Sequence, residues 1–290
     1  MPQNTSAPGR IVVGVDTSDN ATRAALWAAR EAEARGLALH VVHALNLPAV
    51  SAMPLEPPEY AAKQHKYATA LIDTVIEKIR DQHPEVVVTG EVSEISAPQT
   101  MVALSQDARL VVTGTRGHGG FAGLLLGSVS LKLAAHSHCP AVVVRGEEPG
   151  DPLNEVVLGV EPDEQEAPIR YAFDAAVDYG AALRVLRAWQ PVHPNARFAI
   201  ASEVTERHRQ EADDVAALLK GIRDEYPGVQ VTTDIVRGNT VPALINEATG
   251  ARLLVVGARR ERRPLSVGAG YVVQGLLSHS PTPVVVVPIR

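Results

Sequence analysis

The chain has 290 residues, enough for one large domain or for two domains of ordinary size. Hydrophobic residues make up 46% of it and charged residues 21%, which is the balance of a globular protein with ample material for a core. The formal net charge of −6 disfavours nucleic acid as a partner, because nucleic-acid binding depends on lysine and arginine side chains that neutralise phosphates.

Five short apolar runs in the first half of the chain predict β-strands. They lie near Arg10–Val15, Ala38–Ala44, Val86–Val92, Leu110–Thr113 and Ala141–Val144. Helical patterns lie between them, such as the alanine-rich segment Ala21–Arg35, which ends at Gly36, and the segment Tyr60–Gln82. Continuous apolar runs are typical of strands buried on both faces, and their alternation with helices predicts a parallel sheet covered by helices on both sides.

The second half of the chain repeats the first half. The stretch Arg109–Gly114 (RLVVTG) returns as Arg252–Gly257 (RLLVVG), and Ile11–Asp16 (IVVGVD) returns as Val156–Glu161 (VVLGVE). The period is about half the chain, which indicates two homologous domains rather than a short solenoid repeat.

A segment rich in proline, glycine and acidic residues, Gly146–Pro152, lies between the two copies and has the composition of a linker. We therefore expect one domain over residues 1–147 and a second over residues 148–290. Each is predicted to be an α/β domain with a doubly wound, five-stranded parallel sheet.

Three strand ends in the first half are candidates for a ligand site, because ligands of open α/β sheets bind beyond the carboxyl ends of the strands. Asp16 follows the first predicted strand, His43 and Ala44 end the second, and Gly114-x-x-Gly117 follows the fourth. Glycines after a buried strand often mark only a turn, but their combination with an acidic residue at a second strand end favours a binding site.

A second glycine segment lies nine residues further on, where Gly127 and Ser128 precede the predicted helix Val129–His136. A helix N-terminus offers unpaired N–H groups and partial positive charge, and a glycine lets an anion approach that backbone. Ser128 can donate a hydroxyl hydrogen bond or cap the helix. The two glycine segments together suit a polyphosphate bound between loop and helix.

Two familiar nucleotide motifs do not explain these glycines. The stretch Gly117–Ala122 matches G-x-G-x-x-G/A, but the dinucleotide fingerprint follows the first strand, with an acidic residue ~20 positions further on. Here the stretch follows the fourth strand, and Cys139 to Val143 stand at that distance. No G-x-x-x-x-G-K-[ST] string occurs either, so a phosphate site here lacks the P-loop lysine.

The constellation resembles the universal stress protein family in its tandem-domain form, over essentially the whole chain. The residues that carry the resemblance are Val13–Asp16, Val42–Ala44, the string Gly114-x-x-Gly117-x9-Gly127-Ser128-Val129 and Cys139–Val144. The resemblance implies a Rossmann-like fold and ATP binding, because members with this glycine string bind ATP and members without it do not. The family has no agreed chemical reaction, and its members are nucleotide-binding regulators of stress responses and growth.

The resemblance also implies roles for single residues. Asp16 and the backbone at Ala44 would contact the adenosine part, and Gly114 would lie against the ribose. The phosphates would be held by Gly117, Gly127, Ser128 and Val129, with Mg²⁺ bound through the phosphates and not by direct protein ligands. Weaker candidates beside these positions are Val15, Thr115, Arg116, His118 and Ser130.

The family pairs its domains through their last strands, here Ala141–Val144 and Pro283–Val287. The resemblance therefore implies an internal pseudo-dimer within this chain, or a homodimer. The protein partner is left open, and so is the Pro-rich loop Asn46–Glu59, which is either a lid or a partner surface.

The second half keeps the scaffold of the motif but changes its surface. Gly257 and Gly270 match Gly114 and Gly127, whereas Glu161, Arg260 and Tyr271 replace Asp16, Gly117 and Ser128. An arginine Cβ conflicts with backbone geometry that glycine allows, and a tyrosine would fill the phosphate space. We expect this half to bind ATP weakly or not at all; if it is used, its site would include Glu161, Gly257 and Gly270.

Competing interpretations remain at this point. One concerns four arginines, which form either an anion patch of their own or a solvated loop, the latter being favoured: Arg259, Arg260, Arg262 and Arg263. Metal binding by His136, His138 and Cys139 is disfavoured by their crowding within four residues. The leading function is ATP-dependent regulation; the alternatives are a slow ATPase or autokinase, a scaffold without nucleotide, and a binder of AMP or cyclic AMP.

The same sequence bears on location. Its single cysteine, Cys139, excludes an internal disulfide and fits a reducing compartment. The first ten residues lack the apolar core of a signal peptide, and no run approaches the ~18 apolar residues of a membrane span. We therefore expect a cytoplasmic protein that does not use a membrane.

Overall fold

The structure is a computed structural model that describes residues 9–45, 58–117, 126–146, 153–190, 201–259 and 270–289, without the side chains of 58–60 and 201–203. His118, Arg260 to Arg263 and nearly all of the loop Asn46–Glu59 lie outside the described residues, so the expectations that fall on them stay predictions. The described residues group into two compact units, one with the first five strands and one with the last five.

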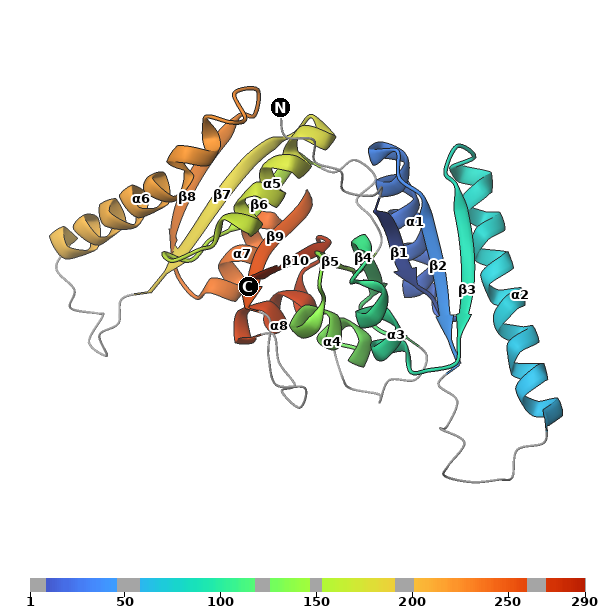
Figure 1. Ribbon diagram of the computed structural model, residues 1–290. Coiled ribbons are helices and arrows are strands. Elements are labelled where there is room, and N and C mark those ends of the chain that lie inside the picture. Colours follow the sequence, from blue (N-terminus) through green and yellow to red (C-terminus); the bar gives the residue numbers. More distant parts are fainter. Residues whose placement is uncertain are drawn as a thin grey trace. The chain divides into compact units, whose positions relative to one another are not determined.

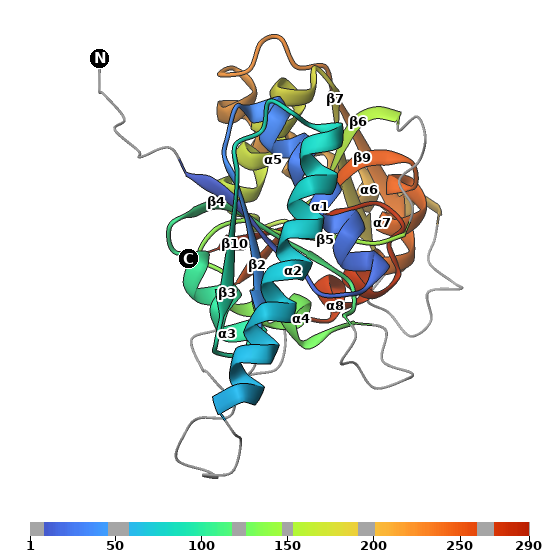
Figure 2. The same ribbon diagram turned by 90° about the vertical axis from the view of Figure 1, so that its right-hand side faces the viewer.

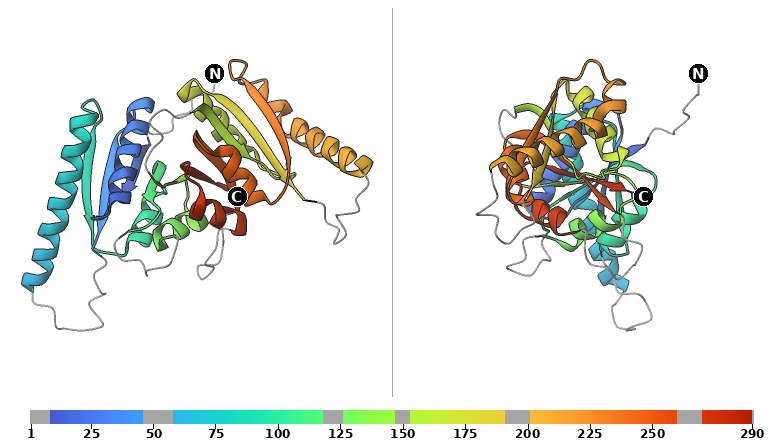
Figure 3. Two further views of the ribbon diagram at one scale, coloured as in Figure 1. Left: turned by 180° about the vertical axis from the view of Figure 1, so that it is seen from behind. Right: turned by 90° about the vertical axis from the view of Figure 1, so that its left-hand side faces the viewer.

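The first unit is a five-stranded parallel sheet with four helices. Its elements are β1 (Arg10–Gly14), α1 (Asp19–Arg35), β2 (Leu39–Ala44), α2 (Pro58–Gln82), β3 (Val88–Ser93), α3 (Ala97–Leu104), β4 (Ala108–Gly114), α4 (Ser128–His136) and β5 (Ala141–Val144). The strands lie in the order β3-β2-β1-β4-β5, and every neighbouring pair is parallel. Helices α1 and α2 cover one face and α3 and α4 the other, as Figures 1 and 3 show.

The second unit repeats this plan. Its elements are β6 (Leu153–Gly159), α5 (Glu166–Tyr179), β7 (Ala182–Trp189), α6 (Ala201–Arg223), β8 (Val231–Arg237), α7 (Thr240–Ala248), β9 (Ala251–Arg259), α8 (Gly270–His279) and β10 (Val284–Ile289). Its strands lie in the order β10-β9-β6-β7-β8, again parallel. The predicted fold class, two doubly wound α/β domains of five strands each, is confirmed. The pairing of the two domains stays a prediction.

The ends of α1 follow from local chemistry. Ser18 is the N-cap, with extended backbone, and its Oγ accepts the N–H of Ala21 at 3.2 Å. The helix therefore begins at Asp19, two residues before its first apolar position. Gly36 ends it in the left-handed conformation with φ 61°, and its N–H reaches back to the carbonyls of the last turn. Figure 2 brings α1 and α2 to the front, side by side.

The central strands carry the core of each unit. In β1 and β4 the residues Ile11, Val12, Val111 and Val112 are fully buried, as continuous apolar runs predict. The edge strand β3 differs, because its centre, Thr89 to Glu91, is exposed. The prediction that the strands are buried on both faces is therefore confirmed for the inner strands and wrong for the edge strand β3. No helix in the described parts of the chain has the length and apolar character that a bilayer crossing needs.

The strand order places a topological switch point in each sheet. From β1 the first unit's chain proceeds outward to β2 and β3, then returns to the other side of β1 with β4 and β5. The loops after β1 and β4 therefore leave the sheet in opposite directions and open a crevice between them. This crevice is where a ligand of such a sheet is expected to bind.

Candidate functional site

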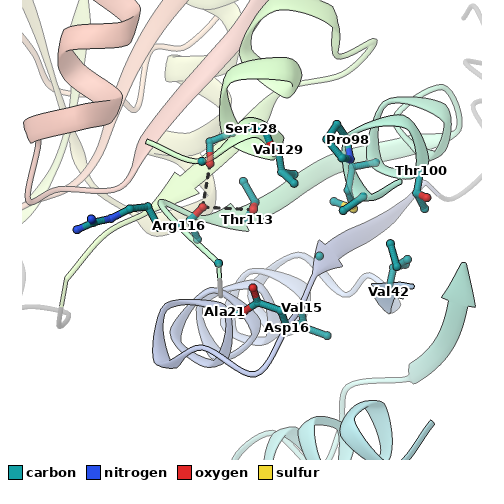
Figure 4. Close-up of a pocket in the computed structure, with 18 of the residues that line it drawn as sticks. Val15, Asp16, Ala21, Val42, Pro98, Thr100, Thr113, Arg116, Ser128 and Val129 are labelled. Atoms are coloured by element: carbon teal, nitrogen blue, oxygen red, sulfur yellow. Dashed lines mark hydrogen bonds between the residues drawn. The ribbon is translucent and has the colours of Figure 1, made fainter. Parts of the chain in front are cut away.

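A cavity of about 600 Å³ opens at the switch point of the first unit. Its walls are the carboxyl ends of β1, β2 and β4 and the first turns of α3 and α4, and Figure 4 shows the side chains that face it. Strand ends and helix starts thus meet at one place, although they lie up to about a hundred residues apart in the sequence.

Most of the predicted site residues line this cavity. They are Val15, Asp16, Ala44, Gly114, Arg116, Gly117, Gly127, Ser128, Val129 and Ser130. Thr115 lies behind the wall, is 4% exposed, and contributes its carbonyl to the loop beneath. The structure therefore brings together the three strand ends singled out from the sequence, but which ligand they bind stays a proposal.

The carboxylate of Asp16 is oriented by the helix that follows it. Its Oδ1 accepts the N–H of Ser18 at 2.9 Å and the hydroxyl of Ser18 at 2.5 Å. Its Oδ2 faces Gly117, where an added Cβ would lie 2.0 Å from that oxygen. The acidic residue after β1 and the second glycine after β4 are therefore in direct contact.

The need for glycine at position 117 comes from this contact and not from backbone geometry. Gly117 is not among the glycines with positive φ, so its own backbone conformation is open to other residues. What excludes a side chain is the Asp16 carboxylate, because the two cannot occupy the same volume. The corresponding expectation for Arg260 in the second unit stays a prediction, because that residue lies outside the described part of the chain.

The other two glycines allow close packing of backbone. A Cβ on Gly114 would lie 2.9 Å from the backbone oxygen of Asn20, so glycine lets the end of β4 approach the start of α1. Gly127 donates its N–H to the carbonyl of Thr115 at 2.8 Å, and a Cβ there would lie 3.2 Å from the same oxygen. The N–H of Gly127 is thus already engaged within the loop.

The N-cap of α4 is Gly127, without a side-chain cap, so Ser128 is the first helical residue and does not cap the helix. The first helical hydrogen bond runs from the N–H of Leu131 to the carbonyl of Gly127 at 3.2 Å. The N–H groups of Ser128 and Val129 precede it and point out of the helix start. Both residues line the cavity, so the positive end of this helix is directed at the ligand space.

Ser130 has a structural part in the wall. Its side chain is buried, and its hydroxyl donates to the carbonyl of Gly114 at 2.9 Å and, more distantly, to that of Thr115 at 3.5 Å. The hydroxyl therefore fixes α4 on the end of β4, and this bond competes with any direct contact to a ligand.

Arg116 adds positive charge at the rim. Its carbonyl accepts long hydrogen bonds from Ser18 and Asn20, both at 3.4 Å, and its side chain extends away from Pro98 and Thr100 on the far wall (Figure 4). Burial lowers the pKa of Arg145, and the charge of Arg116 lowers it further. The two guanidinium groups therefore repel each other.

One wall of the cavity was not foreseen from the sequence. It is formed by the start of α3, with Ser96, Pro98, Thr100 and Met101. This segment follows β3, so it lies at a fourth carboxyl strand end, and that position is the signal that could have identified it. The hydroxyls of Ser93 and Thr100 lie 2.8 Å apart and join the end of β3 to this helix.

The corresponding residues of the second unit have other surroundings. Glu161 binds Arg187, and a Cβ on Gly257 would lie 2.6 Å from the carboxylate of Glu164. Gly270 starts α8 with φ 75°, and the next side chain, Tyr271, is 85% exposed. The expectation that Tyr271 fills a phosphate space is therefore wrong, because this side chain extends into solvent.

Metal binding at the end of α4 gains no support. Among the described residues no group of three or more His, Cys, Asp or Glu side chains is placed to hold a metal ion. Burial raises the pKa of the Cys139 thiol to about 11, which disfavours the thiolate that a metal requires.

Comparison with known proteins gives consistent matches. The model of the universal stress protein family matches residues 8–145 and again residues 153–288. Universal stress protein Rv2623 of Mycobacterium tuberculosis is 33% identical over 286 residues, which cover 95% of each chain. Universal stress protein Rv1996 of the same organism is 32% identical over an alignment of 303 positions, and the alignment covers 96% of this chain and 95% of the relative.

A solved structure has the same fold. A universal stress protein from Archaeoglobus fulgidus DSM 4304 matches with a TM-score of 0.74 at 16% identity, over 97% of this chain and 98% of that chain. At this identity the likeness concerns the fold alone.

Proposed function

Because the chain belongs to the universal stress protein family, we propose that it is a cytoplasmic regulator that binds ATP in its first unit. The observation that carries the proposal is the meeting of Asp16, Gly117 and the start of α4 around one cavity at the switch point. Family members with the string G-x-x-G-x9-G-S bind ATP, and the first unit has this string from Gly114 to Ser128.

The cavity offers different chemistry on its different walls. Apolar groups of Val42, Pro98 and Met101 suit a base and its sugar, with Asp16 and the backbone of Ala44 as polar partners. The N–H groups of α4's first turn suit a phosphate chain, because they carry partial positive charge. An adenine nucleotide lying from α3 toward α4 would satisfy both walls.

A divalent ion would accompany the phosphates. Because the described residues provide no cluster of carboxylate and imidazole ligands, most ligands of the ion would be phosphate oxygens and water. Mg²⁺ prefers such surroundings, since it keeps several waters and binds through one or two carboxylates at most.

The proposal is tested by titrating the purified chain with Mg-ATP and following heat and melting temperature. At 100 times its dissociation constant a ligand adds about 2.7 kcal/mol to stability. Gly117→Ala is expected to weaken binding about tenfold or more, equivalent to about 1.4 kcal/mol, because the new Cβ displaces the Asp16 carboxylate. Unchanged affinity in this variant would contradict the assigned site.

A matched control is Gly221→Ala in α6. It makes the same chemical change at a glycine with nothing within 4 Å of the added Cβ. It is expected to keep wild-type affinity and to stabilise the helix by about 0.5–1 kcal/mol. Mass spectrometry of nucleotide released on denaturation then distinguishes ATP from AMP and cyclic AMP.

A further inference from the structure

The two units place different residues at the same point of the strand that follows α1 or α5. Gly14 pairs with Val42 in the first sheet, and Gly159 pairs with Leu186 in the second. The next residue along is His43 in β2 and Arg187 in β7. By the same register Asp16 and Glu161, each two residues after the paired glycine, occupy equivalent positions.

His43 leaves the cavity of the first unit open. It lines the cavity, is half-buried, and donates its Nδ1–H to the carbonyl of Val15 at 2.8 Å. This bond holds the end of β1 without engaging the Asp16 carboxylate, whose Oδ1 accepts from Ser18 and whose Oδ2 faces Gly117.

Arg187 makes the equivalent backbone contact in the second unit, and in addition it pairs with two carboxylates. Its guanidinium donates to the carbonyl of Val160 at 3.4 Å and to Glu161 at 3.0 Å. It also donates to Glu211 of α6 at 2.7 Å. The acid at the position of Asp16 is thus paired with a cation on the neighbouring strand.

Arg187 and Glu211 hold the buried centre of this ion-pair group, whereas the side chain of Glu161 is 55% exposed. Arg187 is 8% exposed and Glu211 only 1%, and Arg207 binds the second oxygen of Glu211 at 2.5 Å. In the first unit no described residue of the corresponding helix α2 lines the cavity. Helix α6 therefore contributes the carboxylate of Glu211 to this group, whereas α2 contributes no described residue to the lining of the first unit's cavity.

The loop after β6 adds carboxylates at this point. It carries Glu161, Asp163 and Glu164; Asp163 pairs with Arg259 at 2.9 Å, and Glu164 lies against Gly257, the equivalent of Gly114. Burial raises the pKa of Glu164, and the neighbouring carboxylates of Glu161 and Asp163 add to that effect. A phosphate bound near Gly257 would therefore face the carboxylate of Glu164.

We propose that Arg187 closes the second unit to nucleotide, by occupying the place that His43 has in the first unit and by pairing with Glu161 and Glu211. The proposal rests on the proposed function in one respect, because it presumes that the open counterpart binds ATP. By this proposal the chain binds one nucleotide, in its first unit. In the second unit, protein side chains occupy the corresponding space.

The first test counts nucleotides per chain by calorimetry and native mass spectrometry with Mg-ATP. One nucleotide per chain is expected, with an affinity that falls about tenfold or more in Gly117→Ala. Two per chain, or one whose affinity Gly117→Ala leaves unchanged, would overturn the closure of the second unit. No binding at all would instead overturn the proposed function, so the two failures are distinguishable.

The second test moves the closing residue into the first unit as His43→Arg. The arginine is expected to pair with Asp16 as Arg187 pairs with Glu161, and to weaken ATP binding about tenfold or more. The matched control is His40→Arg on the same strand, because the second unit carries Arg184 at that position and His40 does not line the cavity.

His40→Arg is expected to keep wild-type affinity; its melting temperature is expected to fall, because His40 is buried and its hydrogen bond to Thr89 at 2.8 Å is lost. Equal affinity of His43→Arg and wild type would overturn the proposal, and so would an equal loss in both variants. If His43→Arg does not fold, the nucleotide count of the wild-type chain decides the question alone.

Discussion

The loops after β1 and β6 begin from the same strand position and end with different chemistry. In the first unit, Asp16 is oriented by Ser18 and faces a bare glycine across an open cavity. In the second, Glu161 is paired with a buried arginine. One fold thus supports an open pocket or a closed ion-pair group, and a few side chains at strand ends decide between them.

The largest predicted loss of stability concerns the ion pairs of Glu211 in the second unit. Glu211→Gln keeps the size of the side chain but removes the charge that Arg187 and Arg207 share. Breaking a buried pair is expected to cost about 3 kcal/mol of unfolding free energy, measured by urea denaturation at neutral pH. Glu206→Gln, which breaks the exposed pair with Arg209, is the control and is expected to cost roughly 0–1 kcal/mol.

The same variant has a defined pH dependence. Burial of Glu211 opposes its ionisation, but hydrogen bonds and charge from Arg187 and Arg207 outweigh burial and lower its pKa. Its ionised form therefore adds stability above the ordinary glutamate pKa of about 4.3, and this stability is lost as the pH falls through the lowered value. The gap between wild type and Glu211→Gln should narrow on acidification; a constant gap would show that charge is not the cause.

A smaller effect is expected at two equivalent glycines, Gly114 at the end of β4 and Gly257 in β9. Gly114→Ala places a Cβ 2.9 Å from the backbone oxygen of Asn20, and overpacking of this kind costs about 1–3 kcal/mol. Gly257→Ala meets the tips of Glu164 and Ile289, both at 2.6 Å, and the ring of Pro168 at 2.9 Å, so it is overpacked as well. Thermal unfolding should therefore show a loss of stability in both variants, and wild-type stability of either one would contradict this account of its contacts.

The smallest effect concerns the helix that follows each of these strands. Ser130 of α4 bonds to the carbonyl of Gly114, whereas Val273 holds the equivalent position in α8. Ser130→Ala should cost about 1 kcal/mol, because a buried carbonyl loses its partner. The melting temperature measures this loss, and an unchanged melting temperature of Ser130→Ala would contradict the role assigned to this bond.

The sequence was sufficient for the fold and for part of the list of residues that line the cavity. Apolar runs, their repetition and the glycine string depend on local pattern, and they predicted the five parallel strands of each unit and ten lining residues of the cavity. The contact of Asp16 with Gly117 was not predictable, because it joins residues about a hundred positions apart whose distance only the packed sheet determines.

The direction in which single side chains extend was also not predictable from the sequence. Tyr271 was expected to fill a space and is instead exposed, since no local pattern tells which way the first side chain of α8 extends. Arg187 was visible in the sequence as part of the repeated strand, but its role depends on Glu211, a residue of a different element. The start of α3 was missed although it also follows a strand end.

The contact between Asp16 and Gly117 has a consequence for the history of such sites. A substitution that adds a side chain at position 117 displaces the carboxylate, and an arginine at the neighbouring strand end then offers it a new partner, as Arg187 does for Glu161. Restoring a glycine to the loop alone would leave that acid paired. We therefore expect that one substitution at position 117 disrupts the pocket of the first unit, whereas opening the second unit requires several substitutions together.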